Sequence, residues 1–195
     1  MSCFYNGVVA NCIKRNLIEK SVMKIEIRHE TIRDYLGIKN VNDLAFGQAN
    51  EGLLIEKLRL NSYFIDKLSI VAELSDRIVG HILFFPIKVH GDSKDYDSLA
   101  LAPMSVIPDL QNNGVGGQLI VKGLEIAKEL GFKSVIVLGH KDYYQRFGFV
   151  RASKWGIKSP FDSPDEAFMA IELIIDGLKD VSGMVEYPKE FEEVS

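Results

Sequence analysis

The chain contains little cysteine. Only Cys3 and Cys12 occur among its 195 residues, and no cysteine follows them. A disulfide framework and a cysteine-ligated zinc site both need several cysteines along the folded chain. None of the four histidines pairs with another at His-x-x-x-His spacing: His29, His81, His90 and His140. The sequence therefore argues against a disulfide scaffold, a cysteine nucleophile and a metal centre, and we expect a reducing, cytoplasmic setting.

Positive charge and long apolar runs are also scarce. Lys and Arg number 23 against 27 for Asp and Glu, which gives a formal net charge of −4 and an isoelectric point near 5.6. Binding to nucleic acid or to an anionic membrane usually needs a basic surface. No apolar run approaches the roughly 20 residues of a membrane span. We therefore expect neither partner, and the length and 47% hydrophobic content predict one soluble domain with a full core.

The first 22 residues differ from the rest. They lack the long apolar core of a signal peptide, and strand-like alternation begins only after Met23. The codons for Glu19 and Lys20 are all purine, at the place where a bacterial ribosome-binding sequence would stand before Met23. We expect Met23 to be the true start, which makes 1–22 an extension, 23–175 the domain and 176–195 a C-terminal segment packed on it or trailing it.

Apolar periodicity predicts an α+β fold with mixed strands. The helix after the glycine-rich stretch connects strands 99–107 and 133–138 and makes them parallel, whereas the earlier strands form an antiparallel meander. Residues 91–98 are expected to form a polar loop tip. The predicted strands are 24–28, 68–74, 77–90, 99–107, 133–138, one starting at Phe149, 167–175 and 183–187; the predicted helices are 31–46, 51–60, the segment from Gly117 to Leu130, and 142–147.

A glycine-rich stretch separates the buried strand 99–107 from the following helix. Free N–H groups and the helix dipole favour an anion at such a helix start, and glycine lets a phosphate approach. A P-loop would need a lysine where Gln118 stands, and the dinucleotide fingerprint would need a glycine where Leu119 stands. With these two motifs excluded, the stretch still suits a pyrophosphate group of another ligand. The alternative interpretation is a structural turn that only packs the helix on the strand.

The ordered motifs resemble those of the GNAT N-acetyltransferases. Val106-Ile107-Pro108-x-x-Gln111-x-x-Gly114-x-Gly116-Gly117 is similar to their acetyl-CoA loop, Arg/Gln-x-x-Gly-x-Gly/Ala after a buried strand. Residues 144–149 match the Tyr-x-x-x-Gly-Phe that follows in that family. Residues 138–144 and 160–168 look like segments of small bacterial predicted acetyltransferases. The resemblance spans residues 23–175.

The resemblance implies a fold and a reaction. The fold is a central mixed sheet with an antiparallel meander, a splayed central parallel pair and flanking helices. The reaction is transfer of an acetyl group from acetyl-CoA, as co-substrate, to an amine by direct attack in a ternary complex. Backbone groups would bind the pantetheine arm and pyrophosphate at Met104, Val106, Gln111, Asn112, Asn113, Gly114, Val115, Gly116 and Gly117.

The catalytic groups follow from the resemblance and from acid–base chemistry. Tyr144 is expected to protonate the leaving thiolate, because a phenol pKa near 10 lies above that of a thiol near 8.5. The alternative for Tyr144 is core packing. His140 stands at a strand end and is a second candidate acid. For the base the chain offers Ser105 and His81, and His81 reads equally well as a core histidine. The backbone N–H of Met104 or a neighbour would bind the oxyanion.

Two other functions stay open at this level. The chain could be a non-catalytic acyl-CoA-binding or sensing module of the same fold, or a nucleotide-binding domain that prefers ATP or NAD. The sequence does not reveal whether the amine belongs to a small molecule or to a protein. It also leaves open whether the protein is a monomer or a homodimer.

Overall fold

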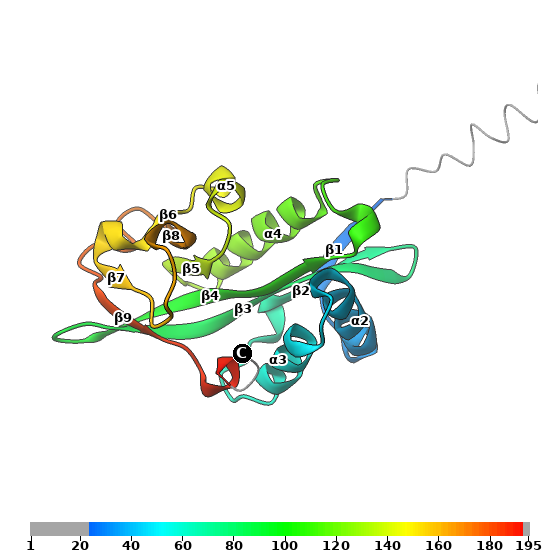
Figure 1. Ribbon diagram of the computed structural model, residues 1–195, viewed down its shortest axis with the longest axis horizontal. Coiled ribbons are helices and arrows are strands. Elements are labelled where there is room, and N and C mark those ends of the chain that lie inside the picture. The colour runs from blue at the N-terminus through cyan, green and yellow to red at the C-terminus, as the bar shows by residue number, and fades with distance from the viewer. Residues whose placement is uncertain (1–23, 193–195) are drawn as a thin grey trace, which may run out of the picture.

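The structure is a computed structural model that describes residues 24–192. One mixed sheet forms its centre, with the strand order β1-β2-β3-β4-β5-β8-β6 (Figure 1). β9 pairs with both β3 and the short β7. This arrangement confirms the expected mixed fold, while the expected start at Met23 lies outside the described residues. The strands are β1 (Glu26–His29), β2 (Ser69–Leu74), β3 (Arg77–His90), β4 (Asp95–Val106), β5 (Ser134–Leu138), β6 (Val150–Arg151), β7 (Ile157–Lys158), β8 (Phe168–Glu172) and β9 (Gly183–Glu186).

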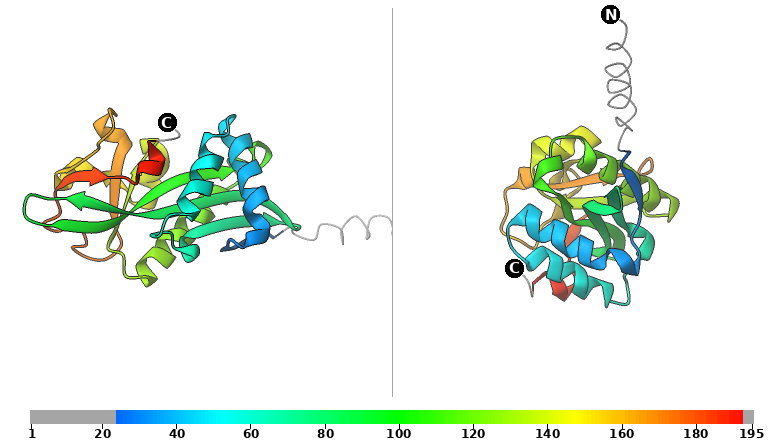
Figure 2. Two further views of the ribbon diagram at one scale, coloured as in Figure 1. Left: turned by 90° about the horizontal axis from the view of Figure 1, so that it is seen from below. Right: turned by 90° about the vertical axis from the view of Figure 1, so that its right-hand side faces the viewer.

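Helices cover both faces of the sheet (Figures 1 and 2). α2 (Tyr35–Phe46) and α3 (Asn50–Arg59) pack on one face, where their buried side chains meet Leu83 and Phe85 of β3. α4 (Val115–Glu129) packs on the other face. A single strand serves both layers because successive side chains point to opposite faces.

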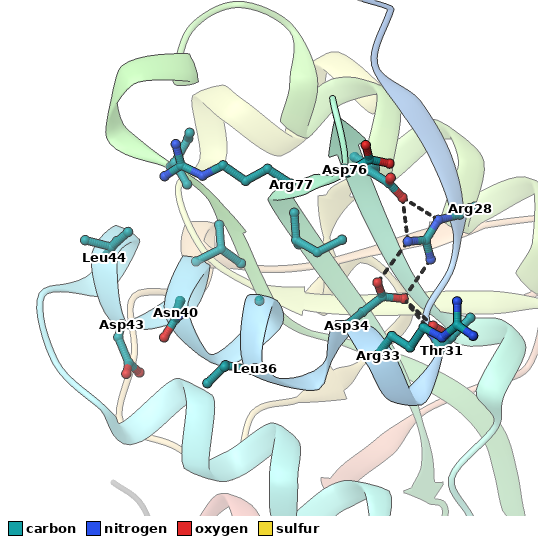
Figure 3. Close-up of a pocket in the computed structure, with 15 residues that line it drawn as sticks. Arg28, Thr31, Arg33, Asp34, Leu36, Asn40, Asp43, Leu44, Asp76 and Arg77 are labelled. Atoms are coloured by element: carbon teal, nitrogen blue, oxygen red, sulfur yellow. Dashed lines mark hydrogen bonds and ion pairs between the residues drawn. The ribbon is translucent and has the colours of Figure 1, made fainter.

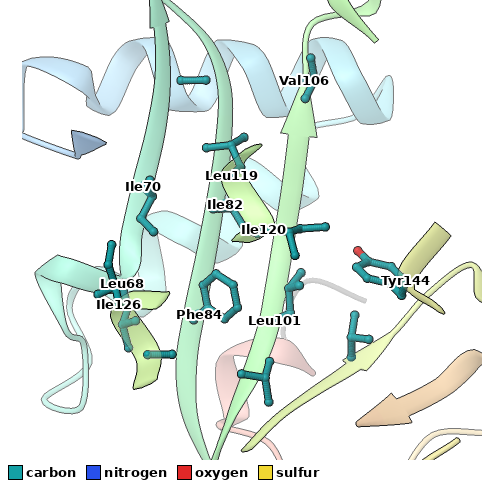
Figure 4. Close-up of a cluster of buried hydrophobic side chains, with 14 of the residues drawn as sticks. Leu68, Ile70, Ile82, Phe84, Leu101, Val106, Leu119, Ile120, Ile126 and Tyr144 are labelled. Carbon is teal, nitrogen blue, oxygen red and sulfur yellow. The ribbon is translucent and has the colours of Figure 1, made fainter. Parts of the chain in front are cut away.

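The main core lies between α4 and the sheet. Leu119 and Ile120 of α4 are fully buried there with Phe84 of β3 (Figure 4). A Cβ atom at Gly123 would lie 2.0 Å from the Phe84 ring, so glycine is needed where the helix crosses this phenylalanine. Close packing of this kind holds α4, and therefore its N-terminus, in a fixed place on the sheet.

The parallel pair of strands separates soon after it forms. β4 and β5 pair only through Leu99 with Val135 and Ala100 with Ile136, and β4 then continues to Val106 without β5 as a neighbour. On its other side β4 carries a bulge, because Ile82 faces Met104 whereas Phe84 faces Leu101. A bulge bends a strand and increases its twist. The splay leaves one edge of β4 open on the side of β5.

Several element boundaries differ from the expected ones. β4 begins at Asp95 instead of residue 99, because residues 95–98 extend the hairpin by pairing with 87–90 of β3. β8 ends at Glu172, three residues before the expected end. Leu130, the predicted last residue of the helix, lies after Glu129 as its C-cap and is 38% exposed. Two-residue strands such as β7 carry too little pattern to be read from a sequence.

The C-terminal segment returns to the helices. After β9 the chain passes Tyr187 and forms a short 3-10 turn, Lys189–Phe191, beside α3 (Figure 2). Asn61 Nδ2 donates a 3.0 Å hydrogen bond to Glu190 Oε1. The segment therefore closes one side of the space between the helices and the splayed strands. In the described residues, no helix is long and apolar enough to cross a membrane.

Candidate active site

The glycine-rich loop ends at the N-terminus of α4. Gly114 is the N-cap with a φ of 83°, and no side chain caps the helix. The Gln118 N–H donates to the Gly114 carbonyl at 3.1 Å, which is the first bond of the helix. Side chains fix the loop, since Gln111 Nε2 donates to the Val106 carbonyl at 3.1 Å and Asn113 Nδ2 to the Gln111 carbonyl at 3.0 Å. The N–H groups of the first turn are thus available to an anion.

Glycine is required in this loop for two different reasons. At Gly114 the backbone is left-handed, and nothing lies within 4 Å of where a Cβ atom would stand. At Gly116 a Cβ atom would lie 2.6 Å from the Tyr143 hydroxyl oxygen. The first glycine permits the turn and leaves its outer side open, and the second lets a tyrosine come close to the helix start.

A cavity of about 690 Å³, here called the loop cavity, lies over this helix start. It is lined by the loop, by Met104, Ser105 and Val106 of β4, and by residues after β5. Of the lysines and arginines in residues 24–192, Arg146 alone lines it. Its guanidinium lies 4.6 Å from the Tyr143 ring centroid, and its Nε donates to the Tyr143 carbonyl at 3.2 Å. The loop cavity therefore combines helix N–H groups with one fixed cation, as an anion site should.

A second cavity, of about 590 Å³, lies at the splay of the strands and is called the splay cavity. It shares Phe46, Met104 and Tyr143 with the loop cavity, so the two meet beside β4. None of the lysines and arginines that the structure describes lines it. Its other polar or aromatic lining residues are Glu51, His140, Tyr144, Phe161, Tyr187 and Phe191.

Tyr144 lines the splay cavity from α5 (Lys141–Tyr144). Its ring is 9% exposed and packs edge-on against Tyr143 and Phe149, with centroids 5.2 and 5.7 Å away. Figure 4 shows the hydroxyl turned from the end of β5 toward β4. Burial, and to a smaller degree Tyr143, raises the pKa of this phenol well above its ordinary value. Tyr144 is therefore a protonated hydroxyl at neutral pH.

The other expected catalytic residues fall in different places. His140 precedes α5, where its carbonyl accepts from the Tyr143 N–H at 3.0 Å, and it lines the splay cavity. Ser105 lines the loop cavity, and its buried Oγ has no hydrogen-bond partner among the described residues. Neither cavity includes His81 in its lining.

His81 is fully buried in β3. Its Nε2 lies 2.9 Å from Ser69 Oγ, in a network where Glu30 also accepts from Arg59 at 2.8 Å. Burial, and secondarily the Arg59 charge, lowers the pKa of His81 to about 3. The imidazole is therefore neutral and buried beneath α2 and α3. This position does not fit the expected role of a base that contacts the substrate.

A further groove, of about 980 Å³, lies elsewhere, between α2 and the turn from β2 to β3 (Figure 3). Arg28 binds both oxygens of Asp34, at 2.7 and 2.8 Å, and donates from Nε to Glu73 at 2.7 Å. The hydrogen bond from Arg28 contributes most to lowering the pKa of Asp34 to about 2. These charges satisfy one another, and the groove shares no lining residue with the two cavities. We therefore interpret these ion pairs as a structural contact that holds β1 against the start of α2.

The loop residues predicted from the sequence lie together at the start of α4, but the sequence did not single out the side chains that line the splay cavity. Glu51, Phe161, Tyr187 and Phe191 come from distant segments that meet only in the fold. Arg146 stood inside the motif after β5 but was not assigned to an anion site. In residues 24–192, no three His, Cys, Asp or Glu side chains come together as a metal site.

Comparisons of the sequence give a consistent result. The profile of the Acetyltransferase (GNAT) family matches residues 38–149. The chain is 37% identical over 134 residues to YjhQ, an uncharacterized N-acetyltransferase of Escherichia coli K12, covering 68% of this chain and 74% of YjhQ. It is 30% identical over 166 residues to YhbS, an uncharacterized N-acetyltransferase of the same strain, covering 85% of this chain and 97% of YhbS.

Solved structures agree with the sequence comparisons. The structure of E. coli YhbS in complex with CoA superposes with a TM-score of 0.81 and 29% identity, covering 87% of this chain and 93% of that one. A GNAT family acetyltransferase from Brucella melitensis in complex with acetyl-CoA gives a TM-score of 0.70 and 29% identity, covering 87% of this chain and 99% of that one.

Proposed function

This chain belongs to the Acetyltransferase (GNAT) family, and on that premise we propose that it transfers the acetyl group of acetyl-CoA to an amine by direct attack in a ternary complex. One observation carries the proposal: the loop cavity and the splay cavity meet beside β4, with Tyr144 in the wall of the second. The proposal is supported by relatives solved with CoA and with acetyl-CoA. One cavity would hold the acyl donor and the other the acceptor.

The loop cavity suits the donor. The backbone N–H groups from Gln111 to Gly117 would hold the pyrophosphate at the positive end of α4. Arg146 would add a cation to this helix dipole. The edge of β4 from Leu101 to Val106, which β5 leaves open, would pair its backbone with the pantetheine arm through Met104 and Val106.

Tyr144 is proposed as the general acid. Acetyl-CoA supplies a thioester whose carbonyl carbon an amine can attack. Tyr144 gives its hydroxyl proton to the departing sulfur as a carbon–nitrogen bond replaces the carbon–sulfur bond, and a proton leaving the amine nitrogen restores the phenol. Because burial raises its pKa, the phenol keeps its proton at neutral pH and would give it to the sulfur only as the nitrogen proton replaces it. The N–H of Met104 or a neighbour at the bulge would stabilise the oxyanion.

An acceptor that enters as an ammonium must first lose one proton to solvent, before the attack and apart from the second nitrogen proton that restores the phenol. His140 fits this role better than His81, because His140 lines the splay cavity and His81 is sealed within the core. Ser105 would act through the loop cavity by orienting the donor instead of removing a proton, since a serine hydroxyl is a poor base without a partner.

The test is product formation. Purified protein is incubated with acetyl-CoA and a panel of small amines and peptides, and acetylated products are identified by mass spectrometry. We expect release of CoA in step with one acetylated amine class. Acetyl-CoA binding without any acetylated product across small and protein amines would contradict the proposal and favour a sensing module.

A further inference from the structure

The splay cavity has an aromatic wall built from three separate segments. Phe161 comes from the loop before β8, Tyr187 follows β9, and Phe191 belongs to the turn beside α3. The Phe161 and Tyr187 ring centroids lie 5.0 Å apart, and those of Tyr187 and Phe191 lie 5.1 Å apart. The rings are tilted against each other, by 46° and 57°, and together they offer a wide apolar surface whose ring faces also attract cations.

One carboxylate faces this wall. Glu51 lies in the first turn of α3 and, within the part of the chain that the structure describes, is the only acidic residue that lines the cavity. Its Oε1 accepts from Gln48 Nε2 at 3.0 Å, whereas its Oε2 is buried and has no hydrogen-bond partner among the described residues. A buried carboxylate oxygen without a donor costs free energy that a bound N–H donor would recover.

Among residues 24–192, no lysine or arginine lines the cavity to balance the charge of Glu51. The remaining titratable side chains there are His140 and the tyrosines 143, 144 and 187. A substrate carboxylate or phosphate would be desolvated here without a cationic partner and opposite a fixed negative charge. A second ammonium on the substrate would likewise lack a carboxylate.

We propose that the acceptor is a primary monoamine on an apolar body, aryl or alkyl, without a carboxylate or phosphate group. Its ammonium is bound by Glu51, and its body packs on Phe161, Tyr187 and Phe191. The inference rests on the proposed function and narrows its substrate class. The splay cavity, about 590 Å³, lies in the size range of small-molecule sites.

Matched substrate pairs test the class without altering the protein. 2-Phenylethylamine and phenylalanine differ by one carboxylate, as do pentylamine and 6-aminohexanoate, while spermidine carries extra ammonium groups. We expect kcat/KM to be at least about 100-fold higher for each monoamine than for its carboxylated partner and than for spermidine, as an unpaired buried charge requires. Equal or faster acetylation of the carboxylated partners, or of spermidine, overturns the inference.

A matched pair of variants tests the anchor. Glu51→Gln should raise the KM for 2-phenylethylamine by about 10-fold or more, since a charge-assisted bond is lost. Glu56→Gln, at an exposed position on the same helix, should leave it unchanged. Far-ultraviolet circular dichroism and the Kd for acetyl-CoA confirm that both variants keep the fold and the donor site. An unchanged KM in a folded Glu51→Gln protein contradicts the role of Glu51.

Calorimetry with acetyl-CoA separates the two possible failures. If acetyl-CoA binds and only carboxylated, multiply charged or protein amines are acetylated, the inference on the acceptor fails and the proposed function stands. If acetyl-CoA does not bind, the proposed function fails and the inference fails with it.

Discussion

At the scale of single residues, Tyr144 illustrates how burial and reactivity are joined. The same contacts that pack its ring against Tyr143 and Phe149 also raise the pKa of its hydroxyl, so packing and proton donation do not exclude each other. Gly139 contributes to this arrangement, since a Cβ atom there would lie 2.5 Å from the Tyr144 ring.

Tyr144→Phe is expected to keep the ring packing and remove only the proton donor. We predict a fall in kcat of about 100-fold, typical of the loss of a general acid, with the Kd for acetyl-CoA changed by less than about threefold. Steady-state kinetics and calorimetry measure the two quantities. Tyr96→Phe, which removes a hydroxyl bound to the Asp180 carbonyl far along the β3–β4 hairpin, serves as the control. Full activity in Tyr144→Phe would leave Tyr144 as a packing residue.

His81 leads to a prediction about stability. Its pKa is lowered to about 3 in the folded protein, against about 6.5 in the unfolded chain, so the unfolded chain binds the extra proton as pH falls between those values. The free energy of unfolding should therefore decrease from pH 6.5 toward pH 3. In His81→Gln, the decrease between pH 7 and pH 4.5 should be smaller than in the wild type by roughly 1–3 kcal/mol. Urea unfolding at the two pH values measures the change.

The same variant separates a structural from a catalytic role. His81→Gln should retain turnover at pH 8 within about threefold of wild type, because the imidazole lines neither cavity. A fall in turnover of about 100-fold, with an unchanged Kd for acetyl-CoA, would instead indicate that His81 acts as the base.

At the scale of elements, the start of α4 and the start of α5 depend on each other. Gly116 and the Tyr143 hydroxyl approach so closely that a Cβ atom at position 116 would force the Tyr143 side chain to shift. Arg146 then lies on the Tyr143 ring, which links the charge of the loop cavity to the same contact. The loop motif and the motif after β5 are therefore parts of one site although about 27 residues of sequence lie between Gly116 and Tyr143.

A double-mutant cycle tests this coupling. Gly116→Ala should weaken acetyl-CoA binding by about 10-fold or more, because its Cβ atom would stand 2.6 Å from the Tyr143 hydroxyl oxygen and displace that ring. Tyr143→Phe removes this oxygen, so adding Gly116→Ala to it should cost much less. Calorimetric Kd values for the four proteins supply the answer. Additive losses would mean that the alanine blocks the ligand itself, independently of Tyr143.

The sequence predicted those elements whose pattern is local. β3 was placed at both ends, since hairpin alternation runs through residues 77–90, and the glycine loop was placed because φ, dipole and spacing all act within a few residues. The start of β4 was not predicted, because residues 95–98 become a strand only through pairing with β3. Glu51 and the aromatic wall were missed for the same reason: no local pattern tells that α3, the loop before β8 and the C-terminal turn meet at one cavity.

At the scale of the whole molecule, the proposed donor and acceptor cavities draw on different parts of the chain. Among the described residues, the lining of the loop cavity extends no further along the sequence than Phe147, whereas that of the splay cavity includes the C-terminal turn. In the proposed function, the segment after β9 therefore contributes to the acceptor site and not to the donor site.

Deleting residues 188–195 should separate the two sides. The Kd for acetyl-CoA should stay within about threefold of wild type, while the KM for the amine acceptor should rise by about 10-fold as Phe191 and the Asn61–Glu190 hydrogen bond are lost. Calorimetry and steady-state kinetics measure both. Loss of acetyl-CoA affinity in a protein that keeps its circular dichroism spectrum would contradict this division.

The central claim, that this chain uses acetyl-CoA, is tested most directly by isothermal titration calorimetry of the purified protein with acetyl-CoA, with ATP and NAD as controls. The account predicts one site for acetyl-CoA with micromolar affinity, about −8 kcal/mol, and no heat of binding for ATP or NAD. Absence of acetyl-CoA binding, or equal binding of ATP or NAD, would contradict it and reduce the glycine loop to a packing turn.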